Sequence, residues 1–395
     1  MATIDSSTNV SCSADSRSHH VTSDVDIFVP FNWSMKEIKD AIPPHLFVRD
    51  TIRGLVYLLR DLVLAAALWK ASGYIDPYLG RHTDGTYTLS NLPLELVVPR
   101  ADFYGIWVIG HEFGSAAMEP SPRLGSSAIR LAMFCIQRYG PPIFLGKYLI
   151  TGITATTHQW NGMKSSSHEI DWDEIFGDTP IYTLFILIRQ QLLAFPAYLL
   201  ANVSGQKRYP RFTNHFNPNS VIFNKSHRRA VMLSNAGILV MILAVFWSCQ
   251  KYGAISVLKR YGIPWLAVSH WFVMITYLHH TSPHLPHYRN NEWSFQRGAA
   301  ATIDRDFLSW QGRFFLHDVA HFHVVHHFFP QMPWYNGAEA TEHLASFLGN
   351  HYMRSSQPVF KELWDTYNEC QFVDDEGDVV FYRNKKGESK RRAAS

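Results

Sequence analysis

Residues Met232–Cys249 read MLSNAGILVMILAVFWSC and contain no charged side chain. A helix that crosses a bilayer needs about 20 consecutive, mostly apolar residues, so this stretch and its flanks are long enough to span a membrane. The alternative is a buried helix at the centre of a soluble α-helical protein, and the complete lack of charge favours the membrane helix. This stretch therefore predicts an integral membrane protein.

Four further apolar runs support the same interpretation. They are Leu55–Ala71, Leu94–Gly110, Ile181–Val203 and Ile263–Leu278. The first and third of these are long enough to span a bilayer, whereas the second and fourth are borderline. Together the five runs predict an all-α, polytopic integral membrane protein with about four transmembrane helices.

The overall composition is rich in apolar residues and poor in charge. Hydrophobic residues make up 47% of the chain and charged residues 17%, with a net charge of +3, so the charge gives no reason to expect a nucleic-acid partner. The four cysteines are scattered and form neither a metal-binding pair nor a disulfide framework. The mean hydropathy of -0.11 is nevertheless low for a polytopic membrane protein.

The two ends of the chain are polar. Residues 1–26 are rich in Ser, Thr, Asp and His and lack the apolar core of a cleavable signal peptide, so they predict a disordered cytosolic tail. Residues 369–395 are interpreted as a polar, basic tail, and the lysines and arginines of Asn384–Arg392 favour a cytosolic C-terminus. The main domain is therefore expected to cover residues 27–368.

A histidine-rich stretch, His321–His327, reads HFHVVHH. His323, His326 and His327 are spaced n, n+3 and n+4, which places three imidazoles on one face of a helix. A polar cluster on a solvated helix is the alternative, but hydrophobic residues flank the run on both sides. Histidines in an apolar setting need a partner, and neutral imidazole suits iron, zinc or copper. The run therefore predicts a metal site.

Several segments together resemble the membrane fatty acyl desaturases of the oleate type, which act at the delta-12 or omega-6 position. The resemblance runs from about Phe31 to Phe381 with one gap. The matching segments are EIKDAIPPHLF (Glu37–Phe47) with Thr51–Arg53, TYLHHTSPHLPHY (Thr276–Tyr288), Glu292–Trp293, Arg297–Ala299, Thr302–Asp306, the histidine run, and MPWYNGAEAT (Met332–Thr341).

The resemblance implies a di-iron enzyme with a cytosolic, His-rich cap in the endoplasmic reticulum membrane, with both termini cytosolic. It implies two iron ions held by eight or nine histidines from three boxes, dioxygen as co-substrate, an acyl lipid substrate and electrons from cytochrome b5 or a similar donor. The metal ligands that it implies here are His111, His280, His323, His326 and His327.

Three further positions follow from the same resemblance. Glu112 is expected to orient one of the metal-binding histidines through its carboxylate without binding the metal itself. His279 stands where the family has glutamine in the loop before the third box. His287 also matches a family position, where a capping or packing role competes with ligation.

The centre of the chain departs from the family. The first box should read H-x-x-x-H, but after His111 the second histidine position is Ser115. The second box, H-x-x-H-H, is absent, because Thr151–His158 reads TGITATTH. From Ser115 to about His168 nothing matches, although both flanks do: IWVIGHE upstream and GDTPIYTLFILIRQQLL downstream.

The genetic code offers an explanation for this gap. Codons built from the third base of one residue and the first two bases of the next can read C-G-H-G-A-F-S through Ser115–Ser121 and V-L-H-S-A-L through Met133–Arg138. They can read W-K-I-S-H-H-R-H-H-R-H-H through Leu145–Thr157 and M-E-R-D-E-V-F-V-P through Gln159–His168. These strings look like the family's first box, linker helix, second box and following segment, in order. We hypothesise that about Ser115–His168 is translated out of frame, which also accounts for the low hydropathy.

Two other functions remain open. The same scaffold serves acyl hydroxylases, epoxygenases, acetylenases and conjugases, which sequence alone does not separate from desaturases. The loss of two boxes also allows a pseudoenzyme that binds lipid or partner desaturases without metal. As it stands, the chain is expected to hold at most a partial metal site and not to desaturate.

Overall fold

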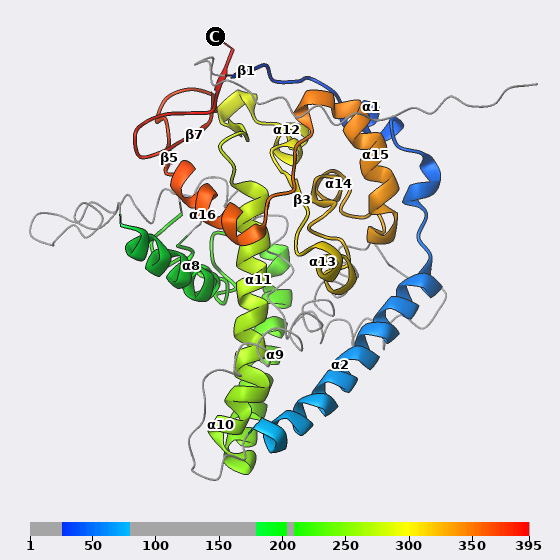
Figure 1. Ribbon diagram of the computed structural model, residues 1–395, viewed down its shortest axis with the longest axis vertical. Coiled ribbons are helices and arrows are strands. Elements are labelled where there is room, and N and C mark those ends of the chain that lie inside the picture. Colours follow the sequence, from blue (N-terminus) through cyan, green and yellow to red (C-terminus); the bar gives the residue numbers. More distant parts are fainter. Residues whose placement is uncertain (1–25, 80–178, 204–208, 395) are drawn as a thin grey trace, which may run out of the picture.

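The computed structural model describes residues 26–79, 179–203 and 209–394. The first 25 residues, the run Leu94–Gly110, His111, Glu112 and the segment Ser115–His168 lie outside this described part. Within it, the chain is mostly helical, with a few short two-stranded sheets. Long helices form a stem, and shorter helices and strands form a cap, which we define as residues 26–50 and 279–394 (Figure 1).

The stem contains α2 (Thr51–Leu79), α9 (Arg228–Tyr252) and α11 (Ile263–His280). Helix α2 starts at the cap and runs down to the region of α10 (Ala254–Val257), and α11 climbs back into the cap (Figure 1). Between α10 and α11 lies the π-helical turn η5 (Leu258–Gly262). Gly253 ends α9 with a φ of +85°, which only glycine adopts easily, so the chain turns there.

The surface of α9 is strongly apolar. Among the described residues, two helices are long and apolar enough to cross a membrane, Pro180–Ala201 and Lys225–Tyr252. On α9, Val240, Leu243 and Phe246 are each more than half exposed. Exposed apolar side chains along a helix of this length are unfavourable in water and natural in lipid, which supports membrane association.

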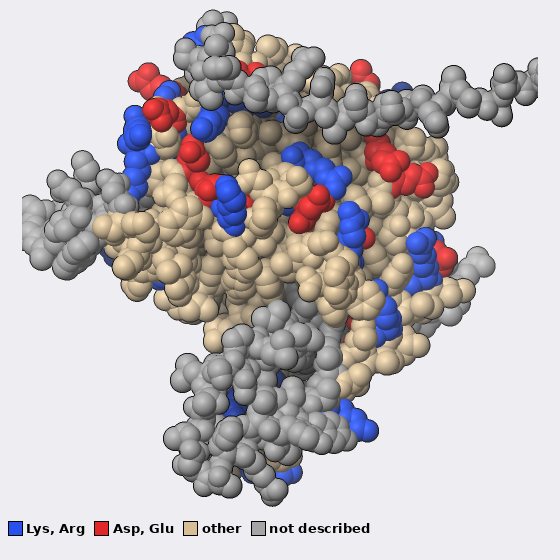
Figure 2. Space-filling model, viewed as in Figure 1, with Lys and Arg blue, Asp and Glu red and all other residues tan. Residues whose placement is uncertain are grey.

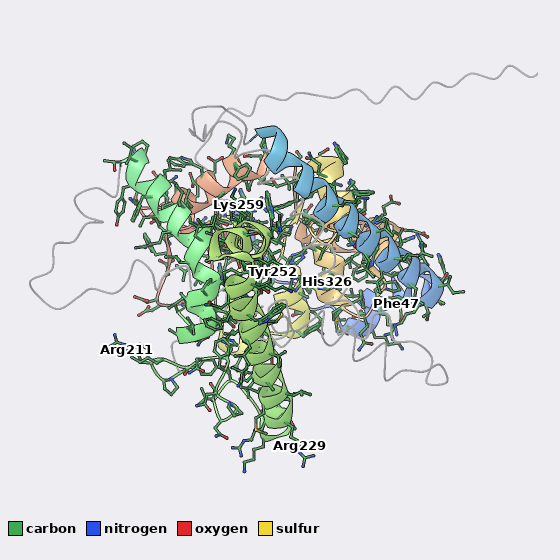
Figure 3. The ribbon with its side chains drawn as sticks, turned by 90° about the horizontal axis from the view of Figure 1, so that it is seen from below. Phe47, Arg211, Arg229, Tyr252, Lys259 and His326 are labelled. Atoms are coloured by element: carbon green, nitrogen blue, oxygen red, sulfur yellow. The ribbon has the colours of Figure 1, made fainter. Side chains whose placement is uncertain are left out.

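Helix α8 (Pro180–Ala201) lies across the direction of α11 rather than along it, in two perpendicular views (Figures 1 and 3). Figure 3 also labels Arg229 and Tyr252, which mark the two ends of α9. Helix α8 begins at Thr179, whose hydroxyl accepts a bond from the Tyr182 amide, and ends at Asn202 in the left-handed conformation. The apolar run Ile181–Val203 thus forms a helix up to Ala201, as predicted, but this helix lies across α11.

Two hydrophobic clusters hold the cap and the helices beside it together. In one cluster, α8, α11 and α16 (Val359–Glu369) pack together through Phe195, Leu278 and Leu363. The other cluster joins α1 (Met35–Asp40), α14 (His323–Phe328) and α15 (Gly337–Leu348). Helices α12 (Phe295–Ala300) and α13 (Ser309–Phe315) complete the cap. Acidic side chains gather on the cap, and the surface of α8 carries none (Figure 2).

Short strands tie the two ends of the chain into the cap. The pairs are β1 (Asp26–Phe28) with β8 (Arg391–Ala393), β2 (His287–Tyr288) with β6 (Val379–Val380), β3 (Asp304–Arg305) with β4 (Arg354–Ser355), and β5 (Phe372–Val373) with β7 (Tyr382–Arg383). Residues 372–393, which the sequence analysis assigned to a polar tail, thus belong to the folded cap. Phe381 and Tyr382 are buried there.

Candidate metal centre

The short helix α14 carries the third histidine box, and its N-terminus is capped by a residue that is distant in the sequence. Its N-cap residue Phe322 makes no side-chain cap bond. Instead, Asp304 of β3 accepts a 2.7 Å hydrogen bond from the Val324 amide and a 2.8 Å bond from the Tyr352 hydroxyl. Burial raises the pKa of Asp304 to about 7, although both of these bonds lower it. The carboxyl group thus serves as the missing cap of α14.

The residue after Asp304 holds the end of α11 in place. Arg305 donates from Nε to the Leu278 carbonyl at 2.9 Å and forms a buried ion pair with Glu362 of α16. Through this side chain, the strand that caps α14 is tied to the helix that carries His280.

Three imidazoles meet between α11 and α14. The Nε2 atom of His323 lies 2.9 Å from Nε2 of His327 and 3.4 Å from Nε2 of His280. The ligand atoms of all three lie within 4.8 Å of one another, and all three side chains are buried. We call His280, His323 and His327 the three-histidine cluster.

These spacings fit a shared metal ion. Imidazole nitrogens bind zinc at about 2.0–2.1 Å. Two nitrogens bound to the same ion at this distance are roughly 3.0 Å apart when the nitrogen–metal–nitrogen angle is a right angle, and roughly 3.4 Å apart when it is tetrahedral. The observed nitrogen separations of 2.9 and 3.4 Å match these values. The cluster therefore has the donor type and the geometry of a metal site.

The protonation state also suits ligation. Burial, reinforced by the neighbouring histidines, lowers the pKa of His323 well below its ordinary value, so the ring is neutral near pH 7. Nδ1 of His323 lies 3.0 Å from the Val319 carbonyl and donates its hydrogen there. This bond fixes the tautomer and leaves the Nε2 lone pair facing the cluster, as in many metal-bound histidines.

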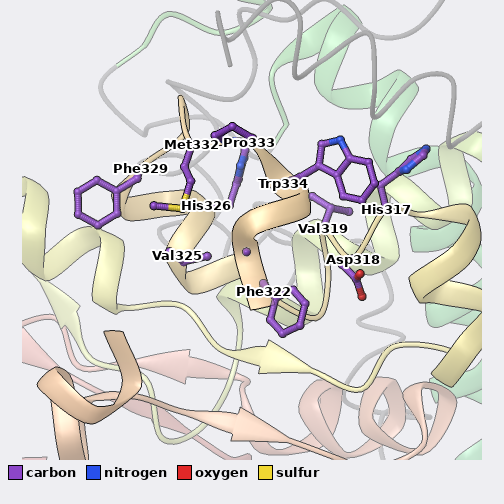
Figure 4. A pocket seen from close by; sticks show the side chains of 11 residues that line it. His317, Asp318, Val319, Phe322, Val325, His326, Phe329, Met332, Pro333 and Trp334 are labelled. Atoms are coloured by element: carbon purple, nitrogen blue, oxygen red, sulfur yellow. The ribbon is translucent and has the colours of Figure 1, made fainter. Parts of the chain in front are cut away.

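His326 points to another side of α14. Its ring centroid lies 5.9 Å from those of both His323 and His327, and it is outside the three-histidine cluster. It lines a mostly apolar pocket with Val325, Met332 and Trp334 (Figure 4). Of the five ligands implied by the resemblance, the structure thus brings together three, places His326 beside them, and leaves His111 outside the described residues.

His287 and His279 have different surroundings from the cluster. His287 packs edge-on against Tyr382, with ring centroids 4.4 Å apart. His279 is completely buried, and both of its ring nitrogens contact backbone carbonyls, Nδ1 that of Ile275 at 2.7 Å and Nε2 that of Ala320 at 2.8 Å. Its ring centroid is 4.5 Å from that of His323.

Sequence reasoning missed His317. This buried side chain donates from Nε2 to Asp61 of α2 at 2.5 Å, and Nδ1 lies 3.3 Å from the Arg60 guanidinium. His317 has a φ of +50° and Asp318 a φ of +58°, a strained pair outside glycine. The only sequence signal was Arg60–Asp61 inside an apolar run, since charges there need a buried partner.

The amino-acid sequence was compared with protein families and with individual known proteins. The family model described as fatty acid desaturase matches residues 104–358. The chain is 33% identical to a Delta(12) fatty acid desaturase of Mortierella alpina over 371 residues, which cover 89% of this chain and 90% of that protein. It is 34% identical to a Delta(12) fatty acid desaturase of Mortierella isabellina, with the same coverage.

A relative with a different named activity is similar over almost the same length. The chain is 31% identical to the oleate hydroxylase of Claviceps purpurea over 401 residues, which cover 91% of this chain and 82% of that protein. The family match, these relatives and the buried histidine cluster agree. The chain belongs to the fatty acid desaturase family and is of its delta-12 oleate desaturase type.

Proposed function

We propose that the gene product introduces a second double bond into an oleoyl-type acyl chain, using dioxygen and electrons from a cytochrome b5-type donor. We place it in the endoplasmic reticulum membrane as a multi-pass protein with both termini in the cytosol. The three-histidine cluster is the observation that carries the proposal, because its nitrogen spacings suit a metal ion. The relatives named as Delta(12) desaturases support the choice of substrate.

The residues of the cap would prepare the centre for iron. Iron supplies the redox chemistry with dioxygen that the removal of hydrogen from an unactivated methylene requires. His280, His323 and His327 would hold one iron ion. His326, with histidines of the first two boxes, would hold the second. Burial lowers the pKa values of His280 and His323, so these two imidazoles are neutral near pH 7 and free to bind metal.

Hydroxylation or triple-bond formation is the second candidate. The similarity to the Claviceps purpurea oleate hydroxylase and to a Delta(12) fatty acid dehydrogenase of Crepis alpina favours keeping it. These reactions need the same cluster and differ in how the reaction ends near the oxidant. Product analysis by gas chromatography with mass spectrometry separates dienes, hydroxy acids and acetylenic acids.

We propose that the chain as it stands has an incomplete metal site. The second box is absent and Ser115 stands in the first box. Among the described residues, the three-histidine cluster is the group of side chains placed to bind a metal ion. We therefore expect about one tightly bound metal ion per chain and no desaturation. Restoring the other reading frame between Ser115 and His168 should add the missing histidines and bring the metal content to two per chain.

The test uses two coding sequences in a yeast that makes oleate but no polyunsaturated fat. One encodes the chain as it stands and the other the frame-restored version, with expression matched by immunoblot. Dienes from the restored version alone support both proposals. Dienes from the first version refute the idea that it is inactive, and no new product from either version refutes the desaturase proposal.

A further inference from the structure

His279 lies next to the cluster without belonging to it, and its two carbonyl contacts differ in kind. The Ile275 carbonyl belongs to the same helix, four residues earlier in α11. The Ala320 carbonyl belongs to the loop that leads into α14, 41 residues further along the chain. Only the Nε2 contact therefore joins the helix of His280 to the segment that carries the box.

Both partners of this side chain are acceptors, so the site calls for a donor. A neutral imidazole carries a single N–H, which can serve only one of the two carbonyls at a time. The side chain has no access to water. The ring nitrogen without a hydrogen therefore faces a carbonyl oxygen with no donor between the two atoms, which is unfavourable.

The loop between His317 and Phe322 determines where the box starts. The Val319 carbonyl accepts the bond that fixes His323, and the neighbouring Ala320 carbonyl contacts His279. The Arg305 amide also donates to Ala320, at 3.2 Å, and its Nε donates to the Leu278 carbonyl, so Arg305 links the loop to α11 indirectly, through β3. The described contacts thus give His279 a direct side-chain link from this loop to the end of α11.

We propose that His279 is a positioning residue for the metal centre. Its Nε2–H bond to Ala320 sets the separation between His280 on one side and His323 with His327 on the other. A change of a few tenths of an ångström there would move three nitrogens out of the spacing that one metal ion needs. This inference rests on the metal site of the proposed function.

The experiment separates the two ring nitrogens. Glutamine places its amide nitrogen near the position of Nε2 and can donate to Ala320, whereas asparagine places its nitrogen near Nδ1 and can reach only Ile275. We would purify the full chain and its variants His279→Gln, His279→Asn and His279→Leu in detergent. Cobalt(II) serves as the probe, followed by its visible absorption and by equilibrium titration. The exposed His343 of α15, changed to Gln and to Asn, is the matched control.

We expect His279→Gln to bind cobalt within about threefold of the parent chain and with the same absorption bands. His279→Asn should bind at least about tenfold more weakly, the range typical of outer partners of metal ligands, and with shifted bands. Thermal unfolding of each variant shows whether it is folded. Because Gln and Asn are both polar and similar in size, a general loss of stability would affect both.

The outcomes are distinct. Equal cobalt binding by the Gln and Asn variants, or unchanged binding by His279→Leu, overturns the positioning role and leaves the cluster intact. If the parent chain binds no cobalt, the metal site itself and the function proposed from it fail.

Discussion

At the scale of single residues, Asp304 is the side chain on which the placement of the histidine box depends most directly. It is buried and accepts from both the Val324 amide and the Tyr352 hydroxyl. Asp304→Ala leaves the buried Val324 amide and the half-buried Tyr352 hydroxyl without their acceptor, so we expect the free energy of unfolding to fall by about 2–4 kcal/mol. Thermal unfolding in detergent would measure the loss.

Two milder variants at the same site provide the controls. Asp304→Asn keeps an oxygen for the Val324 amide, and the Tyr352 hydroxyl can turn to accept from the new amide group, so it should lose less than half as much. Tyr352→Phe removes one bond and should cost about 1 kcal/mol. An alanine variant as stable as the parent would contradict the capping role of Asp304.

Residue spacing predicted part of this site and could not predict the rest. A helix turns by about 100° per residue, so His327 is offset from His323 by about 40° in one direction and His326 by about 60° in the other. The spacing therefore gave one broad face, as expected. Which of the two joins His323 depends on the position of His280 on α11, a long-range packing arrangement that local spacing does not contain.

At the scale of elements, the buried pair of Asp61 and His317 joins the first stem helix to the cap. Both side chains are almost completely buried, and Arg60 adds a bond to the Phe314 carbonyl at 3.0 Å. Asp61 also accepts from Arg60 Nε at 2.8 Å, so its removal leaves the buried His317 N–H and the Arg60 guanidinium without their acceptor, at a cost of about 1–3 kcal/mol for each. Asp61→Ala should therefore unfold at a clearly lower temperature than the parent chain.

A surface contact between the same elements gives the comparison. Arg53 of α2 lies over the ring of Tyr335, 4.3 Å from its centroid, and Arg53→Ala should cost no more than about 1 kcal/mol. If Asp61→Ala and Arg53→Ala lower the unfolding temperature equally, the pair does not hold α2 to the cap.

Helix α8 illustrates why hydropathy predicts helices better than it predicts their orientation. Like α9, it is long and apolar enough to cross a membrane. However, Thr183 and Gln191 are buried, and Phe195 packs in the cluster shared with α11 and α16. Average hydropathy does not register which face is covered by the protein, so the sequence predicted the helix and not its direction.

At the scale of the whole molecule, the sequence predicted a helical membrane protein with a histidine-rich site, and it missed how the ends contribute. Apolar runs and histidine spacing are local patterns, and the four apolar runs that lie within the described residues form helices, as does the stretch His323–Phe328. The pairs β1 with β8 and β2 with β6 join residues that are far apart in the sequence, and each of these strands is only two or three residues long. Such short strands leave no periodic pattern to recognise.

The arrangement of stem and cap predicts which side of the membrane each part faces. Helix α9 has 25 residues and is about 37 Å long at 1.5 Å per residue, enough to cross a hydrocarbon core of about 30 Å. Its C-terminal end leads into α10, which lies at the end of the stem remote from the cap (Figure 1), and η5 with Lys259 follows directly. Lys386 lies in the cap, near the C-terminus, and is exposed. With a cytosolic cap, these two lysines belong on opposite sides of the bilayer.

Cysteine labelling in sealed microsomes would test this topology. The four native cysteines are first replaced, and single cysteines are then introduced as Lys259→Cys and Lys386→Cys. A membrane-impermeant maleimide added outside should label residue 386 at once and residue 259 only after detergent opens the vesicles. Immediate labelling at both positions would place the tip of the stem on the cytosolic side, so that α9 would not cross the bilayer. The apolar surface of α9 would then have to be covered by another protein surface instead of lipid.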